Sequence, residues 1–319
     1  MSPLLVTRTL PEDATDAALR ADVRNGLTAH PKWLPPKWFY DARGSELFEQ
    51  ITELPEYYPT RAEREILATR SGEIAAASGA RTLIELGSGS SEKTRFLLDA
   101  LEPSVYVPVD VSESALTQAG KALVEDRQDL EVHALIADFT APLTLPATPG
   151  PRLLAFLGGT IGNLLPEERA KFLASVRSLL APGDGLLLGT DLVKDERVLV
   201  RAYDDAAGVT AAFNKNVLAV VDRELGADFD PDAFDHVALW DAEREWIEMR
   251  LRSRTAQTVK VPALDLAVDF AAGEDLRTEV SAKFRRHGVS AELAAADLEL
   301  THWWTDSEAR FALSLSVVR

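Results

Sequence analysis

The 319-residue sequence contains no cysteine. This absence excludes disulfide bonds, thiolate nucleophiles and zinc sites built on cysteine. Basic residues are also scarce, because 34 lysines and arginines face 51 aspartates and glutamates, for a formal net charge of −17. A nucleic-acid surface needs clustered Lys and Arg, so we expect no nucleic-acid partner.

Long apolar runs are missing as well. No stretch approaches the ~18 consecutive apolar residues of a membrane-spanning helix, and the N-terminal segment has no apolar core of signal-peptide length. The five histidines show no i, i+4 pair. The acidic segment 227–235 lacks the glycine and glutamate positions of a calcium-binding loop. We therefore expect a cytoplasmic protein with no membrane partner and no metal ion.

Short apolar runs alternate with amphipathic stretches from about residue 60 to residue 191. Each run predicts a buried strand, and the runs are 83–86, 105–109, 132–136, 153–157 and 186–188. Thr60 and Glu63 have the spacing of a capping box, which predicts that a helix begins there. Strands that alternate with helices indicate a parallel sheet with right-handed crossovers.

The rhythm changes after Asp191. Residues 201–225 predict a helix, and residues 245–255 and 263–270 alternate with period two, which indicates antiparallel strands with one wet face. Residues 298–306 and 310–319 then predict two strands joined by a short turn. We therefore predict an α/β fold with a doubly wound, mostly parallel sheet that ends in an antiparallel hairpin. Roughly the first 59 residues and the middle block would lie outside this sheet.

A glycine turn follows the first predicted strand, in "IELGSGSSEK". The spacing from Gly89 to Lys93 is wrong for a phosphate-binding Walker loop. Gly87 and Gly89 match a dinucleotide fingerprint, but Glu92 replaces its third glycine and would oppose a pyrophosphate at the helix N-terminus. S-adenosylmethionine (SAM) has no phosphate, so the turn favours SAM, and NAD remains the alternative.

Acidic residues follow the next two predicted strands. Asp110 stands about twenty residues after Gly87, which suits a ribose hydroxyl pair. Asp138 can accept a hydrogen bond from the adenine amino group, and Phe139 can stack on the adenine ring. Lys93 can face the methionine carboxylate as a point charge. All these positions fall at the carboxyl ends of strands, where open α/β sheets bind ligands.

Longer motifs carry a family resemblance. The segments "LPPKWFYDARGSELFEQITELPEYYPTRAE", "ELGSGSSEKTR", "GGTIGN", "GTDLVKD", "RAYDDAAGVTAAFNKNVL" and "THWWTD" together resemble the histidine Nα-methyltransferases of ergothioneine biosynthesis. The match runs from about residue 15 to the end. It implies a class I SAM-methyltransferase core over residues 60–193 and 284–319. It also implies a second, α+β substrate-binding domain over residues 6–59 and 194–283.

The resemblance implies an activity too. Three methyl groups would pass from SAM to the α-amino nitrogen of L-histidine, giving hercynine, and the enzyme would be a monomer. Gly87, Lys93 and Asp110 match positions that bind SAM, and Asp138 and Phe139 match the adenine contacts. Ser90 stands where Gly or Thr is more usual in the motif, and we expect no effect from this difference.

Six further residues match positions around the amino-acid substrate. They are Tyr57, Glu279 and Ser281 at the imidazole, Asn163 and Tyr203 at the carboxylate, and Tyr40 near the reacting amine. Tyr40 is our candidate catalytic residue, because its hydroxyl could help to remove the amine proton.

Besides an NAD-dependent oxidoreductase, which Glu92 opposes, two other functions stay open at this stage. A SAM-dependent N-methyltransferase could act on another amino acid or a small amine, and the pair Glu279 and Ser281 with Tyr57 argues against that. A non-catalytic SAM-binding protein would be expected to lack the SAM turn or the substrate-carboxylate residues, and neither is lost here.

Overall fold

The computed structural model describes residues 4–11, 13–89 and 91–318. The chain forms two compact units. The first unit comprises Met1–Pro11, Pro59–Val193 and Phe284–Arg319, and the second comprises Glu12–Tyr58 and Lys194–Lys283. Each unit has its own core and is described by itself. Within the described residues, no helix is long and apolar enough to cross a membrane.

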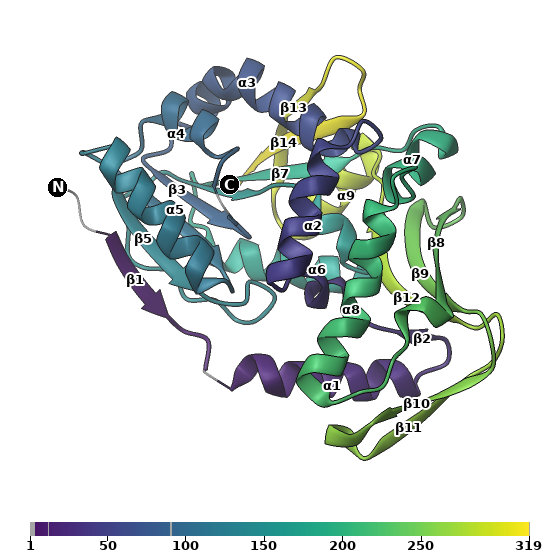
Figure 1. Cartoon of the computed structure of the whole chain (residues 1–319). Helices are drawn as coiled ribbons and strands as arrows, with labels where there is room; N and C mark the ends of the chain where they lie inside the picture. The colour runs from purple at the N-terminus through teal and green to yellow at the C-terminus, as the bar shows by residue number, and fades with distance from the viewer. Residues whose placement is uncertain (1–3, 12, 90, 319) are drawn as a thin grey trace. The chain divides into compact units, whose positions relative to one another are not determined.

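An eight-stranded sheet forms the centre of the first unit, in the order β1-β5-β4-β3-β6-β7-β14-β13 (Figure 1). The strands are β1 (Leu4–Arg8), β3 (Thr82–Leu86), β4 (Val105–Asp110), β5 (Glu131–Ile136), β6 (Arg152–Phe156), β7 (Gly185–Asp191), β13 (Glu299–Thr305) and β14 (Phe311–Val317). Strand β14 is antiparallel to both of its neighbours, and the other pairings are parallel. The predicted mostly parallel sheet with a terminal hairpin is confirmed.

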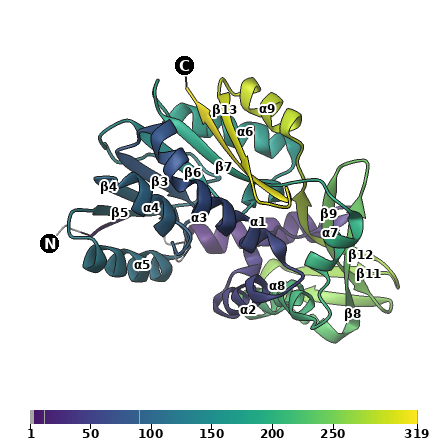
Figure 2. The same ribbon diagram turned by 90° about the horizontal axis from the view of Figure 1, so that it is seen from above.

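Helices cover both faces of this sheet. They are α3 (Tyr58–Ser78), α4 (Arg95–Leu101), α5 (Glu113–Asp126), α6 (Pro166–Leu179) and α9 (Arg286–Ala295). The chain steps outward through α4 and α5 from β3 to β5, and in the opposite direction through α6 from β6 to β7. Because parallel crossovers are right-handed, α6 lies on the opposite face from α4 and α5. Helix α9 packs beside α6 (Figure 2).

The N-terminal strand corrects the sequence prediction. Strand β1 pairs in parallel with β5, with Leu4 opposite Val132 (Figure 1). We predicted residues 6–59 in the second domain, but residues 6–11 belong to the first unit. Strand β1 begins with three apolar residues, but Leu5 and Val6 are 46% and 43% exposed, as in an edge strand. Its partner lies more than a hundred residues along the chain, which no local pattern reveals.

The second unit is built on a four-stranded sheet, in the order β2-β12-β9-β8, with a separate β10-β11 pair. The strands are β2 (Lys32–Trp33), β8 (Phe234–Asp241), β9 (Trp246–Ser253), β10 (Gln257–Val261), β11 (Leu266–Phe270) and β12 (Asp275–Ala282). The helices are α1 (Ala14–Thr28), η1 (Pro36–Phe39), α2 (Ala42–Glu53), α7 (Glu196–Tyr203) and α8 (Val209–Leu225). The predicted antiparallel pairing is confirmed for β9 and β11.

The predicted helix over residues 201–225 is divided in two. Helix α7 ends at Tyr203, and α8 begins at Val209. The Asp205 carboxylate accepts hydrogen bonds from the backbone N–H groups of Val209 and Thr210, at 3.0 and 2.7 Å. These bonds satisfy donors at the start of α8 that have no partner within the helix. The break leaves Tyr203 at a helix end.

Candidate functional site

The glycine turn lies at the carboxyl edge of the parallel sheet. Strands β5, β4, β3, β6 and β7 are consecutive in the sheet, so the segments that follow them share one edge. Gly87 and Gly89 have φ values of +69° and +50°, a region that strains other residues. A Cβ atom on Gly87 would lie 3.4 Å from the Phe139 ring. The backbone of Gly87 and the Phe139 ring therefore lie side by side at this edge.

Asp110 holds the turn in place. Its carboxylate accepts hydrogen bonds from the backbone N–H groups of Gly89, at 3.0 Å, and Ser112, at 2.9 Å. A carboxylate has about four acceptor positions, so these two bonds leave capacity for hydroxyl donors. Asp138 is oriented in a similar way, because one of its oxygens accepts from the backbone N–H of Thr140 at 2.8 Å. Ser90 lies outside the described residues.

Lys93 is held by a buried carboxylate that the sequence analysis assigned elsewhere. The Lys93 ammonium pairs with Glu63, which is 0% exposed. The other Glu63 oxygen accepts from the backbone N–H of Gly158 at 2.7 Å. The predicted capping box of Thr60 and Glu63 is wrong, since α3 already begins at Tyr58. The Glu63 carboxylate bonds to Lys93 and Gly158 instead of capping the helix. It therefore links Lys93 to the loop after β6.

Glu85 is a buried carboxylate that bonds to residues beside the glycine turn. Its carboxylate accepts from Thr94 Oγ1 at 2.6 Å and from the Tyr106 hydroxyl at 2.5 Å. Ser91 Oγ lies 2.9 Å from the same hydroxyl. Burial, which outweighs these hydrogen bonds, raises the pKa of Glu85 to about 7. Sequence analysis missed this residue, although an acid within the apolar strand "TLIEL" was a signal.

Replacing Glu85 with Gln should change how stability depends on pH. The folded-state pKa of about 7 lies above the usual 4.5, so the stabilisation from protonation is complete below pH 4.5 and lost as pH rises through 7. A shift of this size corresponds to about 3 kcal/mol. Urea unfolding of both proteins at pH 5 and pH 8 measures it. From pH 5 to pH 8, we expect the free energy of unfolding to fall in the wild type and to change less in the variant. An equal change in both proteins would contradict the assignment.

Asn163 belongs to the first unit, apart from the other five predicted substrate residues. It ends the short helix η2 (Thr160–Asn163), which follows β6. Gly158 and Gly159, with φ values of +75° and +69°, make the turn into η2. The amide of Asn163 therefore lies in a segment at the same sheet edge as the glycine turn.

Three of the predicted substrate residues meet within the second unit. The Tyr203 hydroxyl lies 2.7 Å from Ser281 Oγ, and both residues are buried. The Tyr57 ring meets the Tyr203 ring edge-on, with 6.3 Å between the centroids. The backbone of Tyr203 contacts His236, whose Nε2 lies 2.8 Å from the Tyr203 carbonyl oxygen. Burial lowers the pKa of His236, so this ring is neutral at neutral pH.

An aromatic cluster continues from Tyr57 to Tyr40. Phe48 lies between them, with its ring centroid 6.2 Å from Tyr57 and 5.5 Å from Tyr40. Phe213 of α8 closes the cluster, 5.4 Å from Tyr40. The Asn216 amide donates to the carbonyl oxygen of the preceding Phe39 at 3.1 Å, which fixes the backbone before Tyr40. Aromatic faces of this kind attract quaternary ammonium groups.

The Tyr40 hydroxyl is protonated at neutral pH. Burial of the hydroxyl raises its pKa far above the usual 10, and the nearby Glu279 and Tyr203 add to the effect. About half of the residue is exposed, so the raised pKa reflects the surroundings of the hydroxyl end rather than of the whole side chain. Tyr40 can donate or accept a hydrogen bond, but a phenolate base at this position is not supported.

Glu279 stands beside an irregularity of β12. The register with β9 shifts between Arg277 and Glu279, and bulges of this kind re-aim side chains. The buried Thr278 sits at the shift, and its hydroxyl donates to Asn214 Oδ1 at 2.5 Å. The sequence shows no sign of this bulge.

Lys283 is a further polar residue that the sequence analysis missed. It is 3% exposed, and its ammonium donates to the Tyr203 hydroxyl and to Ser281 Oγ, both at 2.8 Å. It also lies over the Tyr203 ring, 4.6 Å from the centroid. A lysine two residues after Ser281 in a strand pattern falls on the same face, and this was the signal available.

The comparison with known proteins decides the family. The model of the family described as histidine-specific methyltransferase, SAM-dependent, matches residues 19–318. The chain belongs to this family. A histidine N-alpha-methyltransferase from Mycolicibacterium smegmatis is 62% identical and one from Mycobacterium tuberculosis is 58% identical. The first alignment covers 97% of each chain, and the second covers 98% of each.

Solved structures support the fold. A SAM-dependent methyltransferase from Clostridium acetobutylicum matches with a TM-score of 0.50 and 11% identity, over 86% of this chain and 98% of that one. The predicted class I SAM-methyltransferase fold is therefore confirmed.

The glycine turn of this SAM-dependent family member fits its co-substrate. A Cβ atom at Gly87 would occupy part of the space beside the Phe139 ring. The Asp110 carboxylate has acceptor positions left for the ribose hydroxyls. A dinucleotide fits the turn less well, because Glu92 stands where the dinucleotide fingerprint has its third glycine. In the described ranges, no group of three or more His, Asp or Glu side chains could hold a metal ion.

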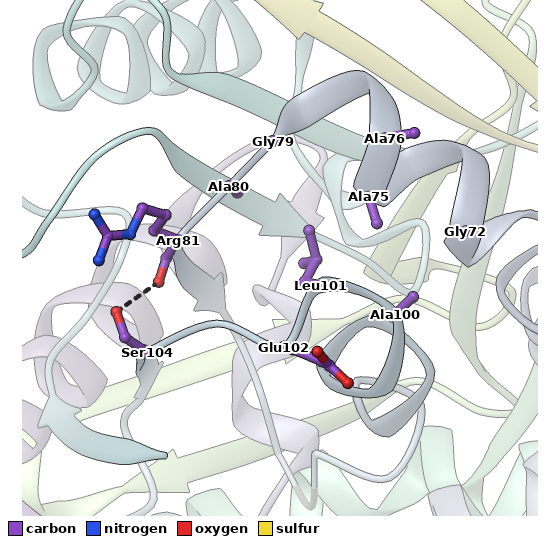
Figure 3. A pocket seen from close by; sticks show the side chains of 10 residues that line it. All are labelled: Gly72, Ala75, Ala76, Gly79, Ala80, Arg81, Ala100, Leu101, Glu102 and Ser104. Carbon is purple, nitrogen blue, oxygen red and sulfur yellow. Dashed lines mark hydrogen bonds between the residues drawn. The ribbon is translucent and has the colours of Figure 1, made fainter. Parts of the chain in front are cut away.

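A shallow hollow of about 620 Å³ lies elsewhere in the first unit (Figure 3). Small residues line it, among them Gly72, Ala75, Gly79 and Ala100. It lies where α3 and α4 end and where β3 and β4 begin, the opposite edge of the sheet from the glycine turn. Because it lies at the opposite edge from the predicted SAM-binding residues, we do not assign the methyl transfer to it.

Proposed function

We propose that this protein transfers three methyl groups from SAM to the α-amino nitrogen of L-histidine and forms hercynine, a step of ergothioneine biosynthesis. The observation that carries the proposal is the meeting of Tyr203, Ser281 and Tyr57 in a family described as histidine-specific. The prediction of a cytoplasmic monomer that needs no metal ion stays part of the proposal.

The first unit binds the co-substrate in this proposal. When bound, SAM supplies an electrophilic methyl group on a sulfonium. Asp110 accepts from the ribose, Asp138 and Phe139 hold the adenine, and Gly87 allows the backbone to approach. Lys93, oriented by Glu63, faces the methionine carboxylate. Most of the rate enhancement comes from alignment, because an in-line displacement needs geometry more than a strong base.

The second unit binds the imidazole ring in this proposal. Glu279 accepts from one ring nitrogen, and Ser281 bonds to the other, with Tyr57 against the ring. An amino acid that lacks ring nitrogens would leave these polar groups without partners, which costs binding free energy and gives discrimination. Asn163 donates to the substrate carboxylate, and Tyr203 is the second carboxylate contact that the family resemblance implies.

The reacting amine needs little help to lose its proton. A free α-amine has a pKa of about 8, so roughly a tenth is neutral at pH 7. The protonated Tyr40 hydroxyl orients the amine rather than taking its proton as a phenolate. Tyr40, Phe48 and Tyr57 offer aromatic faces to the growing ammonium cation, worth ~0.5–2 kcal/mol.

Mass spectrometry of the purified protein incubated with SAM and L-histidine tests the proposal. Other amino acids and small amines are incubated in parallel. We expect a product with three added methyl groups from histidine only. If SAM binds but the methylated product comes from another amine, the imidazole roles of Glu279, Ser281 and Tyr57 are rejected and the alternative N-methyltransferase is correct.

A further inference from the structure

The bulge in β12 decides which face of the second unit's sheet carries Glu279. Arg277 is opposite Arg250 of β9, whereas Glu279 is opposite Met249. Arg250 and Met249 are consecutive, so their side chains lie on opposite faces of the sheet. Directly opposed residues share a face, so the extra residue Thr278 puts Glu279 on the face of Met249. In a regular ladder, Glu279 would lie on the face of Arg250 instead.

The face of Met249 is the core face of this sheet. Met249 and Ile247 belong to the same apolar core as Phe213 of α8. Ser281 is opposite Ile247, so it shares this face with Glu279. The bulge therefore brings both proposed imidazole residues to the side of the sheet where α8 packs.

Asn214 of α8 bonds to both strands at the bulge. The residue is 0% exposed. Its Oδ1 accepts from the Thr278 hydroxyl at 2.5 Å, and its Nδ2 donates to the Arg250 carbonyl oxygen at 3.1 Å. The extra residue of a bulge disrupts the hydrogen bonds between the two strands. The Asn214 amide therefore supplies hydrogen bonds to β12 and β9 at the place where their ladder is interrupted.

His236 determines the orientation of this amide. Its Nε2 lies 2.8 Å from the Tyr203 carbonyl oxygen, so Nε2 carries the proton that it donates. Burial lowers the pKa of His236, so the ring is neutral and its Nδ1 is a bare acceptor. Asn214 Nδ2 lies 2.8 Å from this Nδ1. With Nδ2 bonded to two acceptors, the Asn214 Oδ1 faces the Thr278 hydroxyl.

We propose that Asn214 is a positioning residue for imidazole binding, because its bond to Thr278 holds the bulge that places Glu279 on the core face. Without this bond, the local register relaxes and the Glu279 carboxylate moves away from the substrate ring. The inference rests on the proposed function, because it needs Glu279 to bind the imidazole. The substrate residues that the family resemblance implies include neither Asn214 nor Thr278.

A double-mutant cycle between Thr278→Val and Glu279→Ala tests the inference. Thr278→Val replaces the hydroxyl that bonds to Asn214 with a methyl group of similar size. In calorimetric titrations of the full-length protein with L-histidine, we expect about fivefold weaker binding in Thr278→Val. In the Glu279→Ala background, the same change should alter histidine affinity by less than about twofold, because the carboxylate that the bulge places is already absent.

Asn214→Ala separates the amide from another contact of the Thr278 hydroxyl, which also lies 3.0 Å from the Met249 carbonyl oxygen. We expect Asn214→Ala to weaken histidine binding by at least about fivefold. Adding Thr278→Val to it should cost less than about a further twofold, because both changes remove the same hydrogen bond. Thr278→Ser keeps the hydroxyl and should bind histidine within about twofold of the wild type.

Thr210→Val is the matched control. It makes the same change at another buried threonine, on α8, and keeps the backbone N–H that Asp205 holds. Histidine affinity should stay within about twofold of the wild type. SAM affinity and the circular-dichroism spectrum of every variant are the folding controls. If Asn214→Ala does not fold, the cycle between Thr278→Val and Glu279→Ala decides the inference.

Three outcomes overturn the inference. The first is an equal loss of histidine affinity from Thr278→Val with and without the Glu279 carboxylate, which is the result of a merely structural role. The second is wild-type histidine affinity in Thr278→Val. The third is wild-type affinity in Glu279→Ala, since the bulge would then place no binding group. In each case a trimethylated histidine product leaves the proposed function standing, and its absence rejects that function separately.

Discussion

Replacing Asp110 with Ala should weaken SAM binding by at least about 100-fold. The change removes the acceptor for the ribose hydroxyls, and hydrogen bonds to a charged group contribute about 1.5–3 kcal/mol each. It also releases the backbone N–H of Gly89, which the carboxylate holds at 3.0 Å. Calorimetric titration with SAM measures the loss directly.

Two further variants sharpen this test. Asp126→Ala removes an exposed carboxylate of the same unit, which pairs with Arg95 at the surface, and should leave SAM affinity within about twofold. Asp110→Asn keeps an acceptor oxygen for Gly89 but loses the charge, so an intermediate loss is expected. Wild-type affinity in Asp110→Ala would remove Asp110 from the SAM site.

The sheet of the first unit was readable from the sequence because its strands are buried on both faces. Strands such as β3, β4 and β6 appear as uninterrupted apolar runs. Their carboxyl ends share one edge by topology alone, so the approximate location of Asp110 and Asp138 followed. Strand β1 was missed because an edge strand is half exposed and its pairing with β5 is set by tertiary contact.

The polar supports of the site could not be read in the same way. Glu63 fits a local capping pattern, yet its carboxylate reaches Lys93 and the loop after β6. Lys283 looks like an ordinary surface lysine, but it is buried against Tyr203 and Ser281. Such roles depend on residues that are distant in the chain, whereas propensity and periodicity report only near neighbours.

Family resemblance gave the substrate residues their roles, and the geometry of the second unit adds the physical reason. Tyr57, Tyr203 and Ser281 come from three different segments and meet directly. A pattern of single residues spread over more than two hundred positions carries no period. Only the fold brings these residues together.

Replacing Glu279 with Ala should weaken histidine binding by more than about 10-fold and lower activity mainly through KM. The carboxylate is the proposed acceptor for the imidazole N–H, and a charge-assisted hydrogen bond is worth about 1.5–3 kcal/mol. The loss should be specific to histidine among ligands, so SAM affinity is expected to stay unchanged. Calorimetry with each ligand separately measures both quantities.

Asp269→Ala removes an exposed carboxylate of β11 that is paired with Thr258. It is the matched control and should leave histidine affinity unchanged. Glu279→Gln keeps an acceptor oxygen without the charge and should fall between wild type and Ala. If Glu279→Ala binds histidine as tightly as the wild type does, another group accepts the imidazole N–H.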